Sequence, residues 1–497
     1  MMWIKFLVLF LLYKSSALAV GPSFLDRFYQ DPKSVSSELP EKIGAGIRSK
    51  FDSEAIDSRS FVIAKDQFRK KYLCAVSQPG QICDDGHNFL PFEGFNEDWQ
   101  LRTFIGGTYE NNILKLTNLN EGHVSVVPWS GHYWPIYQGG IGARYGDPKF
   151  PRSESFKTNY KYYAKNYLKQ PSSNADELAK LSPSEKYDYL IGDREWSLTQ
   201  SVWMEGKSFL DSTGKVETWM GICHGWAPAA FVVPEPQQAF DLDLQGGKGI
   251  LRVYPHDLKG LVSQLWAQSN FNYNFLGGRC NDKNPKTDSN GRIISSECFD
   301  INPATWHLAL VHWVGRNHQS FVLDATYDYE VWNQPISGYK LSYFNPETKK
   351  QDTIENSLIS YSRVKNDLYK KYRSPNTKYL LGVISEIQYV VEEEPDHNNM
   401  ISDPLSRLVT VNYYYDLELD DSYNIIGGEW YQQGHPDMLW KPAPGVLARA
   451  IGEESLPEWQ GDFPVPNDFF RVGITASAQK TPLSRILDKL IGWSIRR

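Results

Sequence analysis

Long apolar runs are missing from this sequence after its first twenty residues, and so are internal repeats and low-complexity tracts. The formal net charge is −7, so the chain lacks the basic excess expected of a nucleic-acid-binding protein. No asparagine begins an Asn-x-Ser/Thr sequon, which hints at bacterial rather than eukaryotic secretion.

Hydrophobic residues form 41% of the chain, which excludes general disorder. At 497 residues, two domains or one enlarged domain with insertions are expected.

The N-terminus has the features of a secretory signal peptide. Lys5 precedes an apolar run over residues 6–13, and Ala17-Leu18-Ala19 gives the small-residue pattern of a cleavage site. The apolar run is too short to span a bilayer. We therefore predict that residues 1–19 are removed, and that the mature protein is extracellular, or periplasmic in a bacterium, with no membrane anchor.

Cysteine is scarce, with five residues in the chain. Cys74 and Cys83 flank a Pro-Gly turn, and Cys280 and Cys298 flank a polar loop. In an oxidising compartment each pair predicts a local disulfide, and this pairing leaves Cys223 over as a free thiol. Spacing does not fix the connectivity, so the alternative is a buried, inert Cys223 with another pairing among the rest.

The order of predicted elements, with helices first and strands second, indicates an α+β fold. Ser182 and Glu185 form a capping box around Pro183 at a first helical position, so a helix begins there. Apolar spacing predicts further helices over 196–206 and from Asp257, which is a plausible cap.

Cys223 is expected at the end of a short strand that follows a turn after Asp211. A helix over the small residues that follow should begin near Pro228, because proline is unfavourable inside a helix. The cysteine would then precede this helix by a few residues.

The second half of the chain is rich in β-branched and aromatic residues, which predicts one antiparallel sheet. The strands are predicted over 306–314, 320–332, 386–391, 409–419 and 424–430. The chain is thus divided into a signal peptide (1–19), an N-terminal cap or propeptide (20–95), a main α+β domain carrying the candidate catalytic residues (96–480) and a C-terminal helix (481–497). That helix places Leu483, Ile486, Leu487, Leu490 and Ile491 on one face, as expected of a docked amphipathic helix.

A cysteine becomes a nucleophile when a helix N-terminus or an imidazole lowers its pKa. His307 and His312 lie on the first predicted strand, and Asp324 lies on the next in an apolar setting, where a carboxylate needs a partner. In a hairpin turning near 315–318, His307 falls opposite Asp324, while His312 lies about 10 Å away. The predicted constellation is Cys223 as nucleophile, His307 as base and Asp324 as the group that orients the imidazole. The alternative is a His–Asp hydrogen bond that only joins two strands.

This order of Cys, His and Asp is similar to the papain-like arrangement shared by cysteine peptidases and transglutaminases. More specifically, VWNQPISGYK over 331–340 closely resembles the surface peptide that plants perceive in the secreted transglutaminase elicitor of Phytophthora, with Ser337 and Tyr339 in place of the usual Arg and Phe. Other stretches that resemble this family extend the match from about 180 to 445: LSPSEKYDYLIGD, WMGICHGWAPAAF, NPATWHLAL and IIGGEWYQQGHPDMLW. The elicitor-like residues in this chain are Val331, Trp332, Asn333, Gln334, Pro335 and Gly338.

The resemblance implies a protein-glutamine gamma-glutamyltransferase with a papain/transglutaminase-like core. Cys223 would form a thioester with a glutamine side chain and release ammonia, and a lysine amine would resolve it to an isopeptide bond. The oxyanion needs hydrogen-bond donors. The candidates are the backbone N–H of Cys223 and an indole N–H of Trp203 or Trp219, with Trp226 as a further oxyanion or substrate contact.

The implied partners are proteins bearing glutamine and lysine, together with a host cell-surface receptor if the elicitor-like peptide is recognised. No cofactor is required by this chemistry. Calcium is considered because some transglutaminases need it, and residues 286–297 have an EF-hand-like spacing through Asp288, Asn290, Gly291 and Glu297. Lys286 stands at the first ligand position, which favours a polar hairpin with no metal site.

Two other function classes stay open on the sequence. A papain-like peptidase or a glutamine deamidase would use the same three residues, with water in place of lysine as the acceptor. A non-catalytic secreted effector, recognised through an exposed VWNQP loop, would need no nucleophile. The second class gains support if Cys223 is disulfide-bonded.

Overall fold

The computed structural model of the protein describes residues 23–40, 42–43, 98–169, 174–244, 249–280, 282, 284–295, 298–326, 330–401 and 407–495. The predicted signal peptide, most of the 20–95 segment, Cys74 and Cys83 lie outside the described residues.

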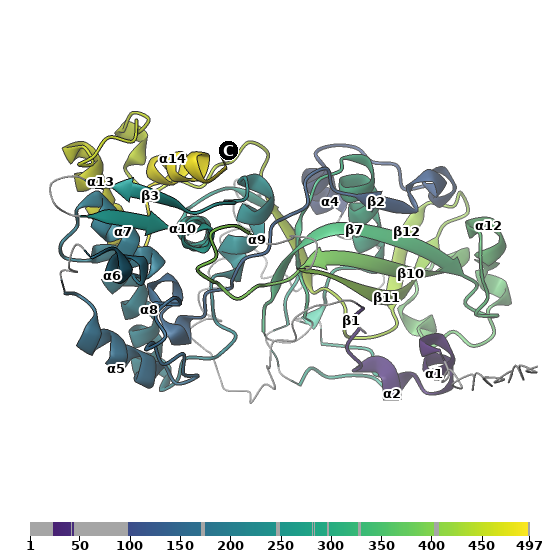
Figure 1. Cartoon of the computed structure of the whole chain (residues 1–497). Coiled ribbons are helices and arrows are strands. Elements are labelled where there is room, and N and C mark those ends of the chain that lie inside the picture. Colours follow the sequence, from purple (N-terminus) through teal and green to yellow (C-terminus); the bar gives the residue numbers. More distant parts are fainter. Residues whose placement is uncertain are drawn as a thin grey trace, which may run out of the picture.

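The structure has a helical lobe and a sheet lobe side by side, with helix α9 between them (Figure 1). The elements of the helical lobe are α5 (Phe156–Asn166), α6 (Ala175–Ala179), α7 (Pro183–Ile191), α8 (Ser197–Thr213), α9 (Cys223–Val232), α10 (Pro255–Gln268), α13 (Asn467–Ser477), α14 (Ser484–Ile495) and the hairpin of β3 (Phe240–Asp243) and β4 (Ile250–Val253). Its core is aromatic: the ring of Trp203 stacks on that of Tyr163 with centroids 4.6 Å apart.

The sheet lobe is built on an antiparallel sheet in the order β1-β11-β10-β7-β6-β13-β5. Strand β12 also pairs with β11, β2 and β8 pair with β7, and β9 pairs with β10. The strands are β1 (Lys42–Ile43), β2 (Glu121–His123), β5 (Tyr273–Gly277), β6 (Val322–Asp324), β7 (Asn333–Phe344), β8 (Gln351–Asp352), β9 (Ile359–Ser360), β10 (Tyr379–Val390), β11 (Leu408–Leu419), β12 (Ile425–Trp430) and β13 (Met438–Pro442).

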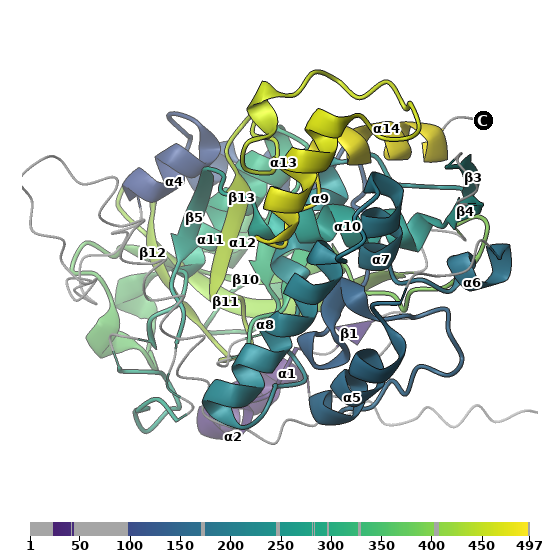
Figure 2. The same cartoon turned by 90° about the vertical axis from the view of Figure 1, so that its left-hand side faces the viewer.

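Further short helices and turns pack in both lobes. They are α1 (Phe24–Gln30), α2 (Pro32–Ser36), α4 (Asp98–Ile105), α11 (Pro303–Ala309), α12 (Ile354–Ser357), the π-helix η6 (Leu310–Arg316), and the 3-10 turns η1 (Ile113–Lys115), η2 (Thr117–Leu119), η3 (Ile136–Gln138), η4 (Gly140–Gly142), η7 (Tyr361–Arg363), η8 (Lys370–Tyr372) and η10 (Glu453–Ser455). The view in Figure 2 faces the helical lobe, and α14 lies at the top with α13. Mixed helices and antiparallel strands confirm the α+β class.

The N-terminal helices dock on the sheet lobe. Phe28 of α1 stacks on Tyr431 with ring centroids 4.4 Å apart, and β1 pairs with β11 at the sheet edge. This part of the 20–95 segment therefore packs on the sheet lobe, along its lower edge in Figure 1.

Several predicted helices are confirmed. Ser182 accepts a hydrogen bond from the backbone N–H of Glu185, completing the capping box of α7. Helix α10 begins at Pro255, two residues earlier than expected, and Asp257 accepts the N–H of Tyr254 at 2.8 Å. The apolar face of α14 is buried, as predicted for a docked helix: Leu483, Ile486, Leu487, Leu490 and Ile491.

Two predicted strands are wrong. Residues 306–314 form α11 and the π-helix η6, because Asn302 caps the backbone N–H of Ala304 and Pro303 starts the helix. The run is buried on every side, so its apolar pattern does not distinguish a strand from a buried helix. The short strand expected before Cys223 is also absent from the described residues, and α8 extends to Thr213 instead.

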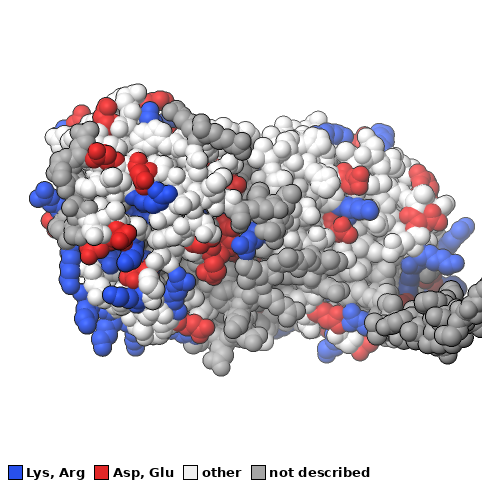
Figure 3. All heavy atoms as spheres, in the orientation of Figure 1, with Lys and Arg blue, Asp and Glu red and all other residues white. Residues whose placement is uncertain are grey.

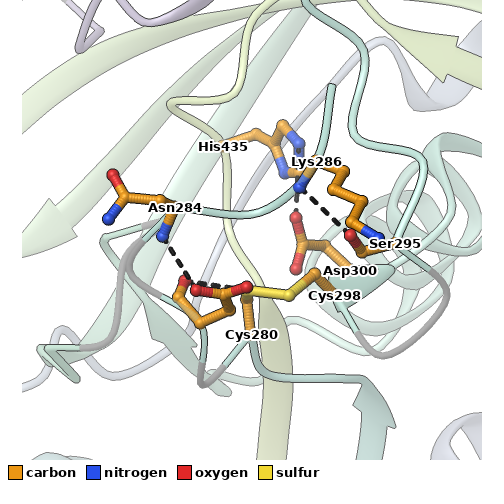
Figure 4. Close-up of a disulfide and its surroundings, with 8 residues drawn as sticks. Cys280, Asn284, Lys286, Ser295, Cys298, Asp300 and His435 are labelled. Atoms are coloured by element: carbon orange, nitrogen blue, oxygen red, sulfur yellow. Dashed lines mark hydrogen bonds and ion pairs between the residues drawn. A yellow bond between two sulfur atoms is a disulfide. The ribbon is translucent and has the colours of Figure 1, made fainter. Parts of the chain in front are cut away.

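The predicted disulfide between Cys280 and Cys298 is confirmed (Figure 4). Beside it, the backbone N–H of Lys286 donates to Ser295 Oγ at 3.1 Å. Next to this bond, His435 Nε2 and Asp300 Oδ2 lie 3.7 Å apart (Figure 4). The bridge thus closes a polar loop that lies against the sheet lobe.

The described residues contain no helix that is long and apolar enough to cross a membrane. On the face shown in Figure 3, acidic and basic side chains are mixed over both lobes. Basic side chains gather at the lower left, where α5 carries an exposed row of Lys157, Lys161 and Lys165.

Replacing both Cys280 and Cys298 with serine should lower the free energy of unfolding by about 3 kcal/mol, because the bridge closes a loop with a sequence separation of 18. Urea unfolding of both proteins measures this difference. An unchanged unfolding midpoint would contradict a stabilising role for the bridge.

Candidate functional site

Cys223 is the first residue of α9, the helix that lies between the two lobes (Figure 1). The helix begins here and not at Pro228, which lies inside it. Proline has no N–H to donate to the preceding turn, yet the helix is held by burial of its small and aromatic side chains. The sequence prediction of a later start is therefore wrong, and the correction puts Cys223 at a helix N-terminus.

The glycines beside Cys223 allow close backbone approach. A Cβ on Gly221 would overlap the carbonyl oxygen of Tyr133, and a Cβ on Gly225 would overlap that of Ser263 in α10. The N–H of Ile222 donates to Tyr133 O at 2.7 Å. These contacts fix the turn that precedes the cysteine.

The Cys223 sulfur contacts the segment that leads into β7. Its thiol donates to the carbonyl oxygen of Val331 at 3.6 Å, and the side-chain amide of Asn333 donates to Sγ at 3.4 Å. Cys223 is not disulfide-bonded and is 5% exposed. The prediction of a free thiol is confirmed.

Burial raises the pKa of the Cys223 thiol. Hydrogen bonds from the Asn333 side chain and backbone act in the opposite direction, and the nearby carboxylates of Glu392 and Asp324 raise the pKa further. The resting thiol is therefore protonated in the neutral range.

Asp324, at the end of β6, holds the chain that faces the thiol. Its Oδ1 accepts the backbone N–H of Trp332 at 2.9 Å and the hydroxyl of Thr326 at 3.0 Å. These bonds hold Thr326 and Trp332, the residue after Val331, against the end of β6. The structure thus brings Asp324 near Cys223, although not through an imidazole.

Glu392 lies on a third segment, after β10. Its Oε1 accepts from the amide of Gln334 at 2.8 Å. The next residue, Glu393, forms ion pairs with two residues of α10, His256 at 3.1 Å and Lys259 at 2.8 Å. Burial of Glu393 acts to raise its pKa, but these two partners lower the pKa to about 2.

His307 is not brought to Cys223 or to Asp324. It lies on α11, where its Nδ1 is 3.0 Å from the hydroxyl of Tyr415 and its ring faces Tyr343, toward the far end of β7 from Asn333. Burial, followed by the charge of His312, lowers the pKa of His307 to about 3. The predicted hairpin of two strands is wrong because α11 takes the place of the first strand.

Two of the three candidate indole donors have structural roles. Trp203 donates to the carbonyl oxygen of Gly142 at 3.2 Å, and Trp226 donates to that of Trp129 at 3.1 Å. Neither N–H is directed at the thiol. Trp219 is buried just ahead of Cys223 in the chain, and its role as a donor stays a prediction.

The elicitor-like peptide is buried, which corrects the expectation of an exposed loop. Val331, Asn333 and Gln334 are each 4% exposed and Trp332 is 9% exposed. Pro335 and Gly338 are buried within β7, which lies between β6 and β10 in the sheet. This run forms a wall of the cysteine site.

Sequence reasoning missed Trp440 and Glu392. The indole N–H of Trp440, on β13, donates to Asn333 Oδ1 at 2.8 Å. Trp440 ends the family-like stretch IIGGEWYQQGHPDMLW, but nothing in that stretch indicates a contact with Asn333, because each residue reaches the site through strand pairing or loop packing.

The loop considered for calcium is closed by its own hydrogen bonds. Asp288 accepts the backbone N–H groups of Asn290 at 2.9 Å and Arg292 at 3.1 Å, and the hydroxyl of Tyr372 at 2.9 Å. Glu297 lies outside the described residues. Within the described ranges, no group of three or more His, Cys, Asp or Glu residues is arranged to hold a metal ion.

Comparisons with known proteins give two matches. The family model described as "Transglutaminase elicitor" matches residues 98–453. Among solved structures, the chain is similar to the GP42 transglutaminase from Phytophthora sojae, with 23% sequence identity and a TM-score of 0.49, over 78% of this chain and 100% of that chain. A search of the curated proteins gave no match.

Alkylation of Cys223 by iodoacetamide should be slow at pH 7 and should keep rising by about tenfold per pH unit through pH 9, because only the thiolate reacts and its pKa is raised. Mass spectrometry of the Cys223 peptide measures the rate, and Cys223→Ser provides the unlabelled control. A plateau below pH 7 would show instead a thiolate stabilised by a cation.

Proposed function

The chain belongs to the transglutaminase elicitor family, and we propose that it is a secreted protein-glutamine gamma-glutamyltransferase with Cys223 as its nucleophile. One observation carries this proposal. A free cysteine begins a helix between two lobes and receives the amide of Asn333 on its sulfur.

In the proposed reaction, Cys223 Sγ bonds to the carboxamide carbon of a glutamine side chain. The C–N bond then breaks, and ammonia leaves with the proton that the thiol has lost. The product is a gamma-glutamyl thioester. The amine of a lysine attacks this thioester, an isopeptide bond forms, and the proton of the amine returns to the sulfur.

The helix N-terminus favours the negative charge that develops during this reaction. Cys223 begins α9 ahead of the first hydrogen bonds of the helix, which the N–H groups of Gly225 and Trp226 donate to Ile222 O at 2.9 and 3.1 Å. The backbone N–H of Cys223 is therefore proposed as one oxyanion donor, as the sequence predicted.

Water in place of lysine would make the same site a deamidase, and the acceptor decides between the two activities. Recognition of an exposed VWNQP loop by a receptor has less support, because these residues are buried in the folded chain. Export after removal of residues 1–19 is part of the proposal and rests on the sequence.

Cys223→Ala should abolish the transfer of a biotinylated primary amine to a glutamine-bearing protein, with a fall of more than about 1,000-fold in rate. Label incorporation and ammonia release are measured together on purified mature protein. Ammonia without label would indicate a deamidase, and neither product from the wild type would contradict acyl transfer.

The sequence predicted His307 as the general base, and one substitution tests that role. A general base contributes about 100- to 10,000-fold to the rate. Because the imidazole lies against Tyr415 and Tyr343, His307→Gln should lower kcat for amine transfer by less than about tenfold. A loss as complete as that of Cys223→Ala, with an unchanged circular dichroism spectrum, would assign His307 to the reaction.

A further inference from the structure

We infer that the side-chain amide of Asn333, oriented by the indole of Trp440, is the second donor of the oxyanion hole. This inference rests on the proposed acyl transfer at Cys223. It assigns a reaction role to two residues that lie on different strands, β7 and β13.

The orientation of the amide follows from hydrogen-bond chemistry. An indole N–H only donates, so the atom of Asn333 that lies 2.8 Å from Trp440 Nε1 is the oxygen. The amide nitrogen then faces the other way, and it lies 3.4 Å from Cys223 Sγ. Trp440 thus ensures that Asn333 presents a donor to the thiol and not an acceptor.

Strand pairing holds both side chains in place. Trp440 pairs with Val322 of β6, and the same strand pairs Asp324 with Asn333 of β7. Asn333 is 4% exposed, so its side chain is packed as well as hydrogen-bonded. A donor held by neighbouring strands of a sheet costs little reorganisation when charge develops.

The distance suits a role in the transition state. In the tetrahedral adduct, the oxyanion and the sulfur are bonded to the same carbon, so a donor beside Sγ can bind that oxygen when the adduct carbon lies on the same side of the sulfur. Effective oxyanion donors lie about 2.7–3.1 Å from the oxyanion. The amide nitrogen carries two N–H groups, and the backbone N–H of Cys223 supplies a donor from the helix side.

The test compares Asn333→Ala, Asn333→Asp and Trp440→Phe in steady-state amine transfer. Asn333→Asp keeps the shape and an acceptor for Trp440 but removes the donor. Both Asn333 variants should lower kcat about 100- to 1,000-fold with KM changed less than about threefold, because the donor acts mainly in the transition state. Asn412→Ala, at a half-buried position on β11, is the matched control and should keep the wild-type kcat.

Trp440→Phe should lower kcat about tenfold, because the amide is then free to turn its oxygen toward the sulfur. The double variant Asn333→Ala/Trp440→Phe should be no slower than Asn333→Ala alone, since Trp440 acts through Asn333. Additive losses would show that Trp440 acts by another route and would overturn its positioning role.

Thermal unfolding and circular dichroism of each variant show whether its fold is retained. A folded Asn333→Asp with wild-type kcat would overturn the inference while leaving the nucleophile assignment intact. A wild type that transfers no amine would instead contradict the proposed function itself. If Asn412→Ala showed the same falls in kcat and in melting temperature as the Asn333 variants, the loss would not be specific to Asn333.

Discussion

The contact between the start of α9 and the start of β7 is the constraint on which the site depends. It joins the helical lobe to the sheet lobe through one sulfur atom and one amide, Cys223 Sγ and Asn333 Nδ2. The turn before the cysteine needs glycine at position 221 because the backbone of Tyr133 lies against it. A shift of either lobe would therefore separate the nucleophile from the Asn333 donor.

Burial keeps the Cys223 thiol protonated in the resting protein. The thiol donates to Val331 O and lies near two carboxylates, so its proton is retained at neutral pH. A protonated thiol reacts slowly with electrophiles in solution, which suits a protein proposed to work outside the cell. The same burial makes each surrounding polar group matter, because in a low-dielectric site hydrogen bonds are strengthened and unpaired groups are costly.

Buried ion pairs hold the segment after β10 in place beside the cysteine site. The segment after β10 carries Glu392 to the thiol, and it is fixed by Glu393, which Lys259 and His256 of α10 bind. Its backbone is held as well, since the N–H of Glu393 donates to Gly131 O at 2.9 Å. Helix α10 therefore supports both α9 and the acidic segment, so three separate parts of the chain meet at Cys223.

The sequence by itself determined the features that local chemistry decides. The capping box at Ser182 starts α7, the apolar face of α14 docks, and the local disulfide leaves Cys223 free. Only the tertiary structure decided the rest. The pairing of β6 with β7 and β13 buried VWNQP and brought Trp440 to Asn333. Those partners are distant in the chain, and no local pattern encodes their contact.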